Sequence, residues 1–95
     1  MNNKPKLLER IDPTLLHHYP TPLHELVANP DWSVRLDVAR RIDPSQLPEM
    51  MGDTHWIVRR EVAMRIPTKY LGLLLMRETS PKVLEIIQER VKTLG

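Results

Sequence analysis

The sequence has 95 residues, the length of one small domain, so we expect a single domain over 1–95. It contains no Cys, which excludes disulfides, Cys-ligated metal centres and thiol nucleophiles, and its short length disfavours most cofactor-dependent enzymes. The 14 Lys and Arg against 12 Asp and Glu give a net charge of +2, and this excess arises entirely within 67–95. The charge balance is therefore weak evidence for a nucleic-acid groove along the middle of the chain.

The apolar stretches of the chain are short. The longest of them, around Leu71–Met76, is interrupted by Gly72 and is far from the roughly 20 residues that a membrane span needs. The segment 1–6 lacks the apolar core of a signal peptide. We therefore expect a cytoplasmic protein that has no membrane partner.

An internal repeat divides the chain into three predicted parts: an N-terminal cap, a series of repeats and a final helix. Residues 1–19 depart from the repeat and are predicted to form an N-terminal cap, while 20–91 follow a period of 24 residues and make about three units. When 29–52 is placed over 53–76, eight positions are identical. The identical pairs are Trp32/Trp56, Val34/Val58, Arg35/Arg59, Val38/Val62, Ala39/Ala63, Arg41/Arg65, Ile42/Ile66 and Leu47/Leu71.

Each unit divides into a short half and a long half, and both are predicted to be helical. The short halves are 20–28, 44–52 and 68–76, and the long halves are 31–42, 55–66 and 80–91. Apolar residues recur at every fourth position of the first two long halves, which is the spacing of a helix and not of a strand. Four pairs place a capping side chain before a proline and so predict helix starts: Asp12-Pro13, Thr21-Pro22, Asp43-Pro44 and Ser80-Pro81. Pro48 predicts 3₁₀ character within 44–51.

The last predicted helix runs to residue 95. Val83, Ile87, Val91 and Leu94 form one apolar stripe along it. We interpret this stripe as the inner face of a C-terminal capping helix, with the seam of a dimer as the alternative. The chain is accordingly expected to be a monomer or a dimer.

The repeated segments resemble a known family. The segment 29–42, from Asn29-Pro30-Asp31-Trp32 to Arg41-Ile42, and its echo 55–66 are similar to the leucine-rich repeat variant family, whose 24-residue repeats alternate an α-helix with a 3₁₀ helix and are HEAT-like. The resemblance implies an all-α fold, a short right-handed helical-repeat stack with capping helices. It also implies a binding scaffold, the usual role of such repeats. The Cys-ligated Fe–S module of some family members is not carried over, because the chain has no Cys.

Five repeated residues are interpreted as structural. Arg35 and Arg59 fall within the apolar arc of their helices, where a charge is kept only if it is paired, so we expect inward arginines bound to an acceptor such as Asp31 or a helix-terminal carbonyl. The alternative is that these arginines form a row, one repeat apart, that binds the phosphates of a nucleic acid. Trp32 and Trp56 are expected to wedge between units, and a stacking platform for nucleic-acid bases is the alternative.

The positions that differ between units are where a partner would be chosen. On the helix face opposite the predicted core, Leu36, Ile57 and Met64 are apolar and are flanked by Arg40 and Arg60. Exposed apolar clusters with a polar rim mark interaction surfaces. We therefore predict that these five residues contribute to a partner-binding surface.

No motif in the sequence points to catalysis or to a cofactor. The four histidines lack the spacing of metal ligands, and no phosphate-binding glycine loop or catalytic triad is evident, so we assign no catalytic, cofactor-binding or metal-binding residue. The leading expectation is a non-enzymatic scaffold that binds another protein. The alternative is a nucleic-acid binder that contacts phosphates through Arg40, Arg60, Lys69, Arg77, Lys82 and Lys92.

Overall fold

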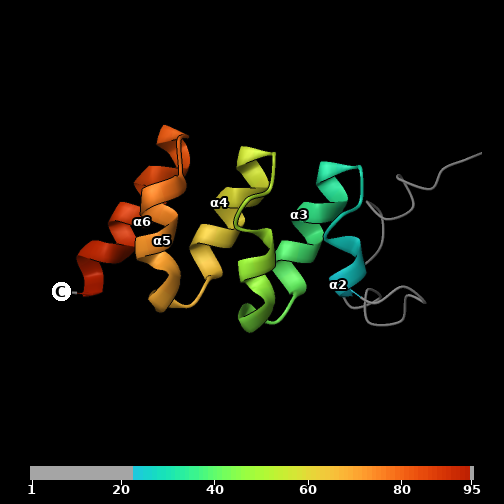
Figure 1. Ribbon diagram of the computed structural model, residues 1–95, viewed down its shortest axis with the longest axis horizontal. Coiled ribbons are helices and arrows are strands. Elements are labelled where there is room, and N and C mark those ends of the chain that lie inside the picture. Colours follow the sequence, from blue (N-terminus) through green and yellow to red (C-terminus); the bar gives the residue numbers. More distant parts are fainter. Residues whose placement is uncertain (1–22, 95) are drawn as a thin grey trace, which may run out of the picture.

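The computed structural model describes residues 23–94, and within this range every regular element is a helix (Figure 1). The prediction of an all-α chain is confirmed for these residues. The predicted N-terminal cap 1–19 lies outside them, as do two of the four predicted capping pairs. The elements are α2 (Leu23–Leu26), α3 (Trp32–Arg41), η2 (Pro44–Met50), α4 (Trp56–Arg65), η3 (Thr68–Tyr70), α5 (Leu71–Arg77) and α6 (Pro81–Leu94).

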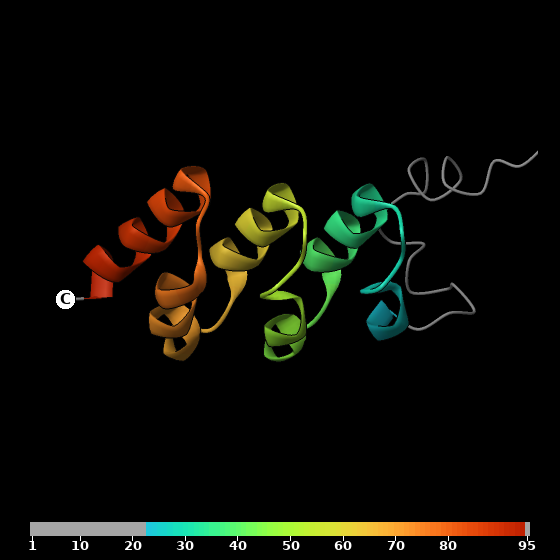
Figure 2. The ribbon, with the colours of Figure 1, turned by 45° about the horizontal axis from the view of Figure 1, so that its top comes forward.

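The helices form two layers along an elongated body of 49 × 21 × 18 Å. Figure 2 shows α3, α4 and α6 side by side in one layer, with α2, η2 and α5 in the other. The central helix α4 packs against α3, α6 and η2, while α2 packs against α3 and α5 against α6. The core therefore lies between the layers and between successive long helices.

Helices α3 and α4 begin at side-chain caps. Asp31 Oδ1 accepts a hydrogen bond of 2.9 Å from the backbone N–H of Ser33, and His55 Nδ1 accepts one of 3.1 Å from that of Ile57. Each cap satisfies one of the N–H groups that a helix start leaves without an intrahelical partner. The helices end where Ile42 and Ile66 become extended, since a proline follows within two residues in each case.

The layer of α2, η2 and α5 is more irregular than the layer of α3, α4 and α6. Asp43 Oδ1 accepts a hydrogen bond of 2.9 Å from the N–H of Ser45, and the following segment Pro44–Met50, which contains Pro48, is 3₁₀ throughout. The sequence predicted helix over 68–76, and the structure resolves this half into η3 followed by α5. Short 3₁₀ segments let the chain turn back toward the next long helix within a few residues.

The core consists of repeat-equivalent aliphatic side chains. Its fully or almost fully buried members are Val34, Val38, Ala39, Ile42, Leu47, Met50, Val58, Val62, Ala63, Ile66, Leu71, Leu74, Val83 and Ile87. The predicted stripe of α6 is buried only in its first half, because Val91 is 38% exposed and Leu94 is exposed as well. The end of α6 thus extends beyond the helices that cover its beginning.

Gly72 lies in the second position of α5, where its backbone is helical and exposed. A Cβ atom added there would meet nothing within 4 Å. Because glycine loses more backbone entropy on folding than alanine, we expect Gly72→Ala to raise the free energy of unfolding by about 0.5–1 kcal/mol. Urea denaturation of both proteins measures this change, and a loss of stability would show that the position needs the freedom of glycine.

Candidate functional site

Two arginines, one from α3 and one from α4, each bind a carboxylate in the loop that precedes the next long helix. Arg35 donates from Nε to Asp53 Oδ2 (2.8 Å), from Nη2 to Asp53 Oδ1 (3.1 Å) and from Nη1 to the carbonyl of Asn29 (2.7 Å). Arg59 repeats the pattern, with Nε and Nη2 each 3.0 Å from the carboxylate of Glu78 and Nη1 2.7 Å from the carbonyl of Asp53. These bidentate pairs hold consecutive units at a fixed spacing.

The carboxylate that binds Arg35 is Asp53 and not Asp31, the carboxylate that the sequence suggested. Asp31 caps α3 instead, and hydrogen bonds from the side chain and backbone of Ser33 lower the pKa of its carboxyl group. The acceptors Asp53 and Glu78 occupy the same place in successive loops, 25 residues apart, and Asn29 is their counterpart in the first unit. The sequence shows that these loop positions carry side-chain acceptors, but which arginine each of them binds depends on how the helices pack.

A second set of arginines reaches back to the preceding long helix. Arg65 donates from Nη1 to the carbonyl of Ala39 and from Nη2 to that of Ile42, at 3.0 Å for the latter. Arg90 makes the equivalent pair of bonds at the end of α4, at 3.0 and 2.6 Å. At the end of a helix the last carbonyl groups receive no hydrogen bond from an N–H group of the same helix, and both arginines supply the missing donor. Arg41, their counterpart in the first unit, has a buried Nε without a hydrogen-bond partner among the described residues.

The two tryptophans contact the N-terminal turn of the next long helix. The ring of Trp32 stacks on that of His55, with centroids 4.0 Å apart. Trp56 packs against the core, with Arg60 and Lys82 positioned 5.2 and 5.7 Å from its ring centroid. Each tryptophan ring is thus occupied by neighbours within the protein.

The partner surface predicted from the sequence is only partly exposed. Met64 is 51% exposed, but Leu36 packs against the core and Ile57 is half-buried. The expectation that all three apolar side chains face solvent is wrong, because each helix has several neighbours. Leu36 lies on α3, which packs against α2 and α4, and Ile57 lies on α4, which packs against α3, α6 and η2. Arg40 lies within 4 Å of two carboxylates, whereas Arg60 is exposed above Trp56.

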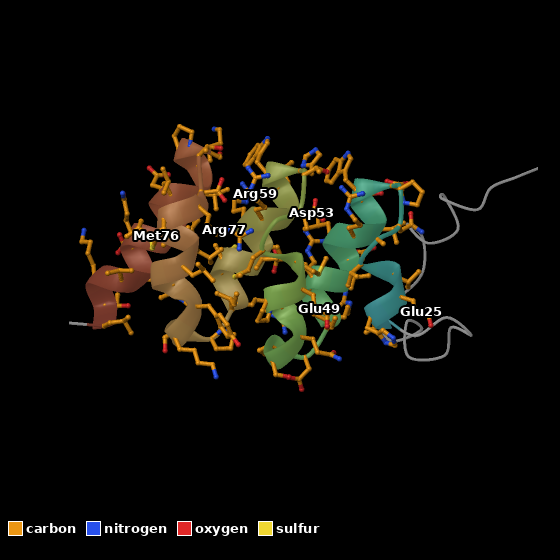
Figure 3. All side chains as sticks on the ribbon, in the orientation of Figure 1. Glu25, Glu49, Asp53, Arg59, Met76 and Arg77 are labelled. Carbon is orange, nitrogen blue, oxygen red and sulfur yellow. The ribbon has the colours of Figure 1, made fainter. Side chains whose placement is uncertain are left out.

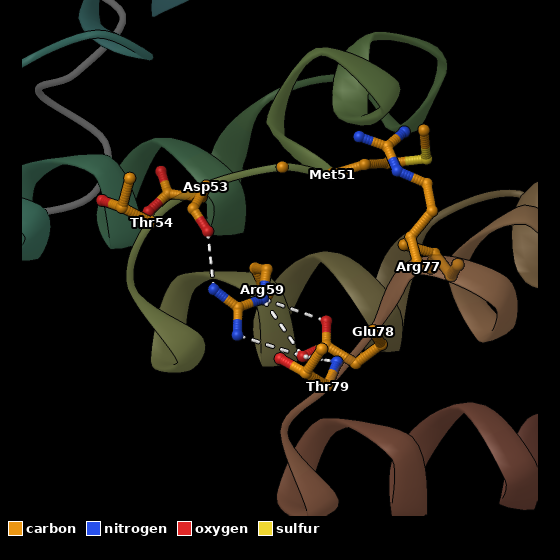
Figure 4. Close-up of a pocket in the computed structure, with 9 residues that line it drawn as sticks. Met51, Asp53, Thr54, Arg59, Arg77, Glu78 and Thr79 are labelled. Atoms are coloured by element: carbon orange, nitrogen blue, oxygen red, sulfur yellow. Dashed lines mark hydrogen bonds and ion pairs between the residues drawn. The ribbon is translucent and has the colours of Figure 1, made fainter.

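A groove of about 270 Å³ opens between the loop before α4 and the loop after α5 (Figure 4). We call it the 53–78 groove. The bond of Arg59 to Glu78 crosses its floor, and the Glu78 side chain is only 2% exposed. The groove is lined by Met51, Gly52, Asp53, Thr54, Arg59, Leu74, Arg77, Glu78 and Thr79.

Arg77 differs from the other charged groups of this groove. It is exposed at the end of α5, and its Nη2 atom lies 3.5 Å from a Cβ position built on Gly52. Figure 4 shows its side chain extending from α5 toward the segment that carries Met51. No hydrogen bond or ion pair joins its guanidinium group to any residue of 23–94. The groove therefore contains one positive charge that no residue of the described part of the chain compensates.

The outer surface of α5 beside this groove is apolar. Met76 is 83% exposed and Leu73 is 41% exposed, and Leu75 is exposed on the other flank of the helix. Leu73, Met76 and Arg77 are spaced i, i+3 and i+4, so they share one side of the helix. We call these three residues the α5 face; Figure 3 labels Met76 and Arg77 on it. The sequence predicted that this apolar segment is too short for a membrane span, but its role as an exposed surface was not predicted.

The Glu78 carboxylate makes stability depend on pH. Burial alone would raise the pKa of Glu78, but hydrogen bonds from Arg59 and from the backbone of Ser80 and Thr79 lower this pKa below its ordinary value of 4.5. Between the two values the unfolded chain binds more protons than the folded chain. The stabilisation from Glu78 is therefore complete above pH 4.5 and is lost as the pH falls through the lowered pKa.

We expect the free energy of unfolding to decrease below pH 4.5 in the unmodified protein and to decrease less steeply in Glu78→Gln. Urea denaturation at several pH values between 3 and 7 measures both slopes. The pKa values of Asp31 and Asp43 are also lowered, by their capping hydrogen bonds with Ser33 and Ser45, so part of the slope will persist in the variant. Identical slopes would show that Glu78 titrates alike in the folded and unfolded chain.

Comparison of the chain with protein-family models gives no match, and comparisons with characterised proteins and with solved structures give none either. The resemblance to the leucine-rich repeat variant family stays a prediction from the residues quoted above. Within 23–94, no three His, Asp or Glu side chains are grouped so that they could hold a metal ion. None of the helices in that range has the length and apolar character needed to cross a membrane.

Proposed function

We propose that the chain is a non-enzymatic scaffold, a short right-handed stack of HEAT-like repeats, that binds another protein. The observation that carries the proposal is the apolar α5 face, where Met76 is 83% exposed next to an uncompensated arginine. Large apolar side chains with a charged rim are the features that interfaces use most. The arginine pairs between units support a rigid platform for such a face.

The location of the surface is the part of this proposal that differs from the sequence prediction. Of the residues predicted there, Leu36 and Ile57 are half-buried, which leaves Met64 as the apolar side chain most available to a partner. The α5 face has two exposed apolar side chains within one helical turn. We therefore place the main contact on α5, with Met64 as a second position to be tested against it.

Nucleic-acid binding is less well supported by the same structure. Of the six cations considered for phosphates, Arg40 and Lys92 lie within 4 Å of carboxylates. Arg60 and Lys82 lie over the ring of Trp56, and Lys69 lies over a tyrosine ring. Because phosphate binding requires several available cations along one path, this distribution favours a protein partner.

Affinity capture tests the proposal directly. The tagged chain and its Leu73→Ser/Met76→Ser variant would be used to capture proteins from the native cell extract at low and high salt, with Met64→Ser as the matched control. We expect a protein that is retained at high salt, lost with the double variant and kept with the control. Captured material that is removed by nuclease or released by salt would contradict the proposal, since phosphate contacts weaken steeply as salt rises.

A further inference from the structure

We infer that the 53–78 groove and the α5 face together bind a segment of a partner protein in which an Asp or Glu carboxylate lies close to an apolar side chain. This inference rests on the proposed function and specifies the chemistry of the partner. The carboxylate would pair with Arg77 at the groove, and the apolar side chain would cover Leu73 and Met76.

The charge of the groove favours an anionic group on the partner. Asp53 is fully engaged by the Nε and Nη2 groups of Arg35, at 2.8 and 3.1 Å, and Glu78 is engaged in the same way by Arg59. Both pairs are largely buried, so they leave no net charge at the surface. Arg77 is the remaining cation of the lining, and one carboxylate would compensate it.

The positions of Leu73, Met76 and Arg77 on α5 favour a partner segment that is both apolar and acidic. Because Leu73 and Arg77 are one helical turn apart and Met76 lies beside them, an extended segment can contact all three at once. Methionine and leucine side chains present adaptable apolar surface, and the planar guanidinium group of arginine offers two parallel N–H groups to a carboxylate. The apolar and charged contacts would therefore be adjacent in the partner as they are on the helix.

The surroundings favour a carboxylate over a phosphate. Because Asp53 and Glu78 are already paired with Arg35 and Arg59, the groove offers a ligand the single positive charge of Arg77, and a doubly charged phosphate would exceed it. A nucleic-acid strand would need further uncompensated cations along its path, and the other arginine of the lining, Arg59, is used by Glu78 and by the carbonyl of Asp53. A single carboxylate fits the one charge that is available.

The test uses the full chain, labelled with ¹⁵N, and short acetylated and amidated peptides. Each peptide carries one Leu and one Glu separated by none to three Ser residues, and a matched series carries Gln in place of Glu. Amide chemical shifts report where each peptide binds and how tightly. The protein variants are Arg77→Gln, and Lys92→Gln as the charge-matched control, because Lys92 is an exposed cation on α6. Thermal melting of each variant checks that it is folded.

We expect at least one Glu peptide to shift the amides of Gly52, Thr79 and α5. Its affinity should fall about threefold to fivefold when Glu is replaced by Gln, or Arg77 by Gln, since an ion pair at an exposed group contributes about this much. The Lys92→Gln protein should bind as the unmodified protein does.

Three results would overturn the inference: no peptide binds, the Gln peptides bind equally well, or inorganic phosphate or a single-stranded oligonucleotide binds the same amides more tightly. These results leave the proposed function intact if a protein is still captured through the α5 face. A loss of that captured protein would instead count against the function itself.

Discussion

Replacement of Arg59 by Ala is expected to lower the free energy of unfolding by about 3 kcal/mol, because it leaves a buried carboxylate without its partner. Glu78, the partner, is 2% exposed and receives both the Nε and Nη2 groups of Arg59. The carbonyl of Asp53 would lose its bond to Nη1 as well. Since this arginine joins α4 to the loop before α6, we expect one cooperative loss of stability. Urea denaturation followed by circular dichroism measures it.

Two matched variants separate this effect from a general loss of charge. Arg60→Ala removes the neighbouring arginine, which is exposed, and should change the stability by less than about 1 kcal/mol. The double variant Arg59→Met/Glu78→Leu removes both charges and should recover part of the stability, because an apolar pair of similar volume often replaces a buried ion pair without loss. If Arg59→Ala and Arg60→Ala were equally mild, the buried pair would contribute little to the fold.

The repeat period allowed the long helices and most of the core to be predicted. The stripes through Val34 and Val58 placed two helices within one or two residues of their observed bounds, since a 3.6-residue pattern directly reports a buried helix face. The proline pairs located the starts of η2 and α6 for a similarly local reason. Helix bounds and helix starts depend on residues that are close in the sequence, so they can be predicted from it.

The arginine partners were not predicted, because they depend on which loops lie side by side. Arg35 and Asp53 are 18 residues apart, and a helical wheel of α3 alone contains no information about the loop before α4. The wheel likewise placed Leu36 toward solvent because it assumes one buried face, whereas α3 has neighbours on two sides. Pairing between units requires the three-dimensional spacing of the helices.

The candidate site was missed for a different reason. Leu73 and Met76 belong to a short half that the repeat comparison matches to its neighbours at few positions, so their segment gave little periodic signal. Their exposure follows from the packing of α5, which buries Leu71 and Leu74 on one side and leaves the opposite side uncovered. A short helix composed almost wholly of apolar residues must expose some of them, and this is the signal that could have indicated the surface.

The second large effect is expected at equivalent core positions of successive units. Ile42 and Ile66 are at most 1% exposed, and each closes the end of its long helix. We expect Ile42→Ala and Ile66→Ala each to lower the free energy of unfolding by about 3 kcal/mol, through lost burial and the cavity that remains. Urea denaturation of both variants should give values within about 1 kcal/mol of each other if the two environments are equivalent. A large difference would contradict that equivalence.

Val91 occupies the same repeat position in α6 and provides the control. It is 38% exposed, so Val91→Ala should cost less than about 1 kcal/mol, since the side chain makes fewer buried contacts and leaves no closed cavity. A cost as large as that of Ile66→Ala would mean that Val91 is covered in solution. Urea denaturation at several protein concentrations then shows which contact buries Val91. Contact with a second copy makes the stability depend on concentration, whereas contact within one chain does not. The alternative of a dimer seam along α6 is decided by that dependence.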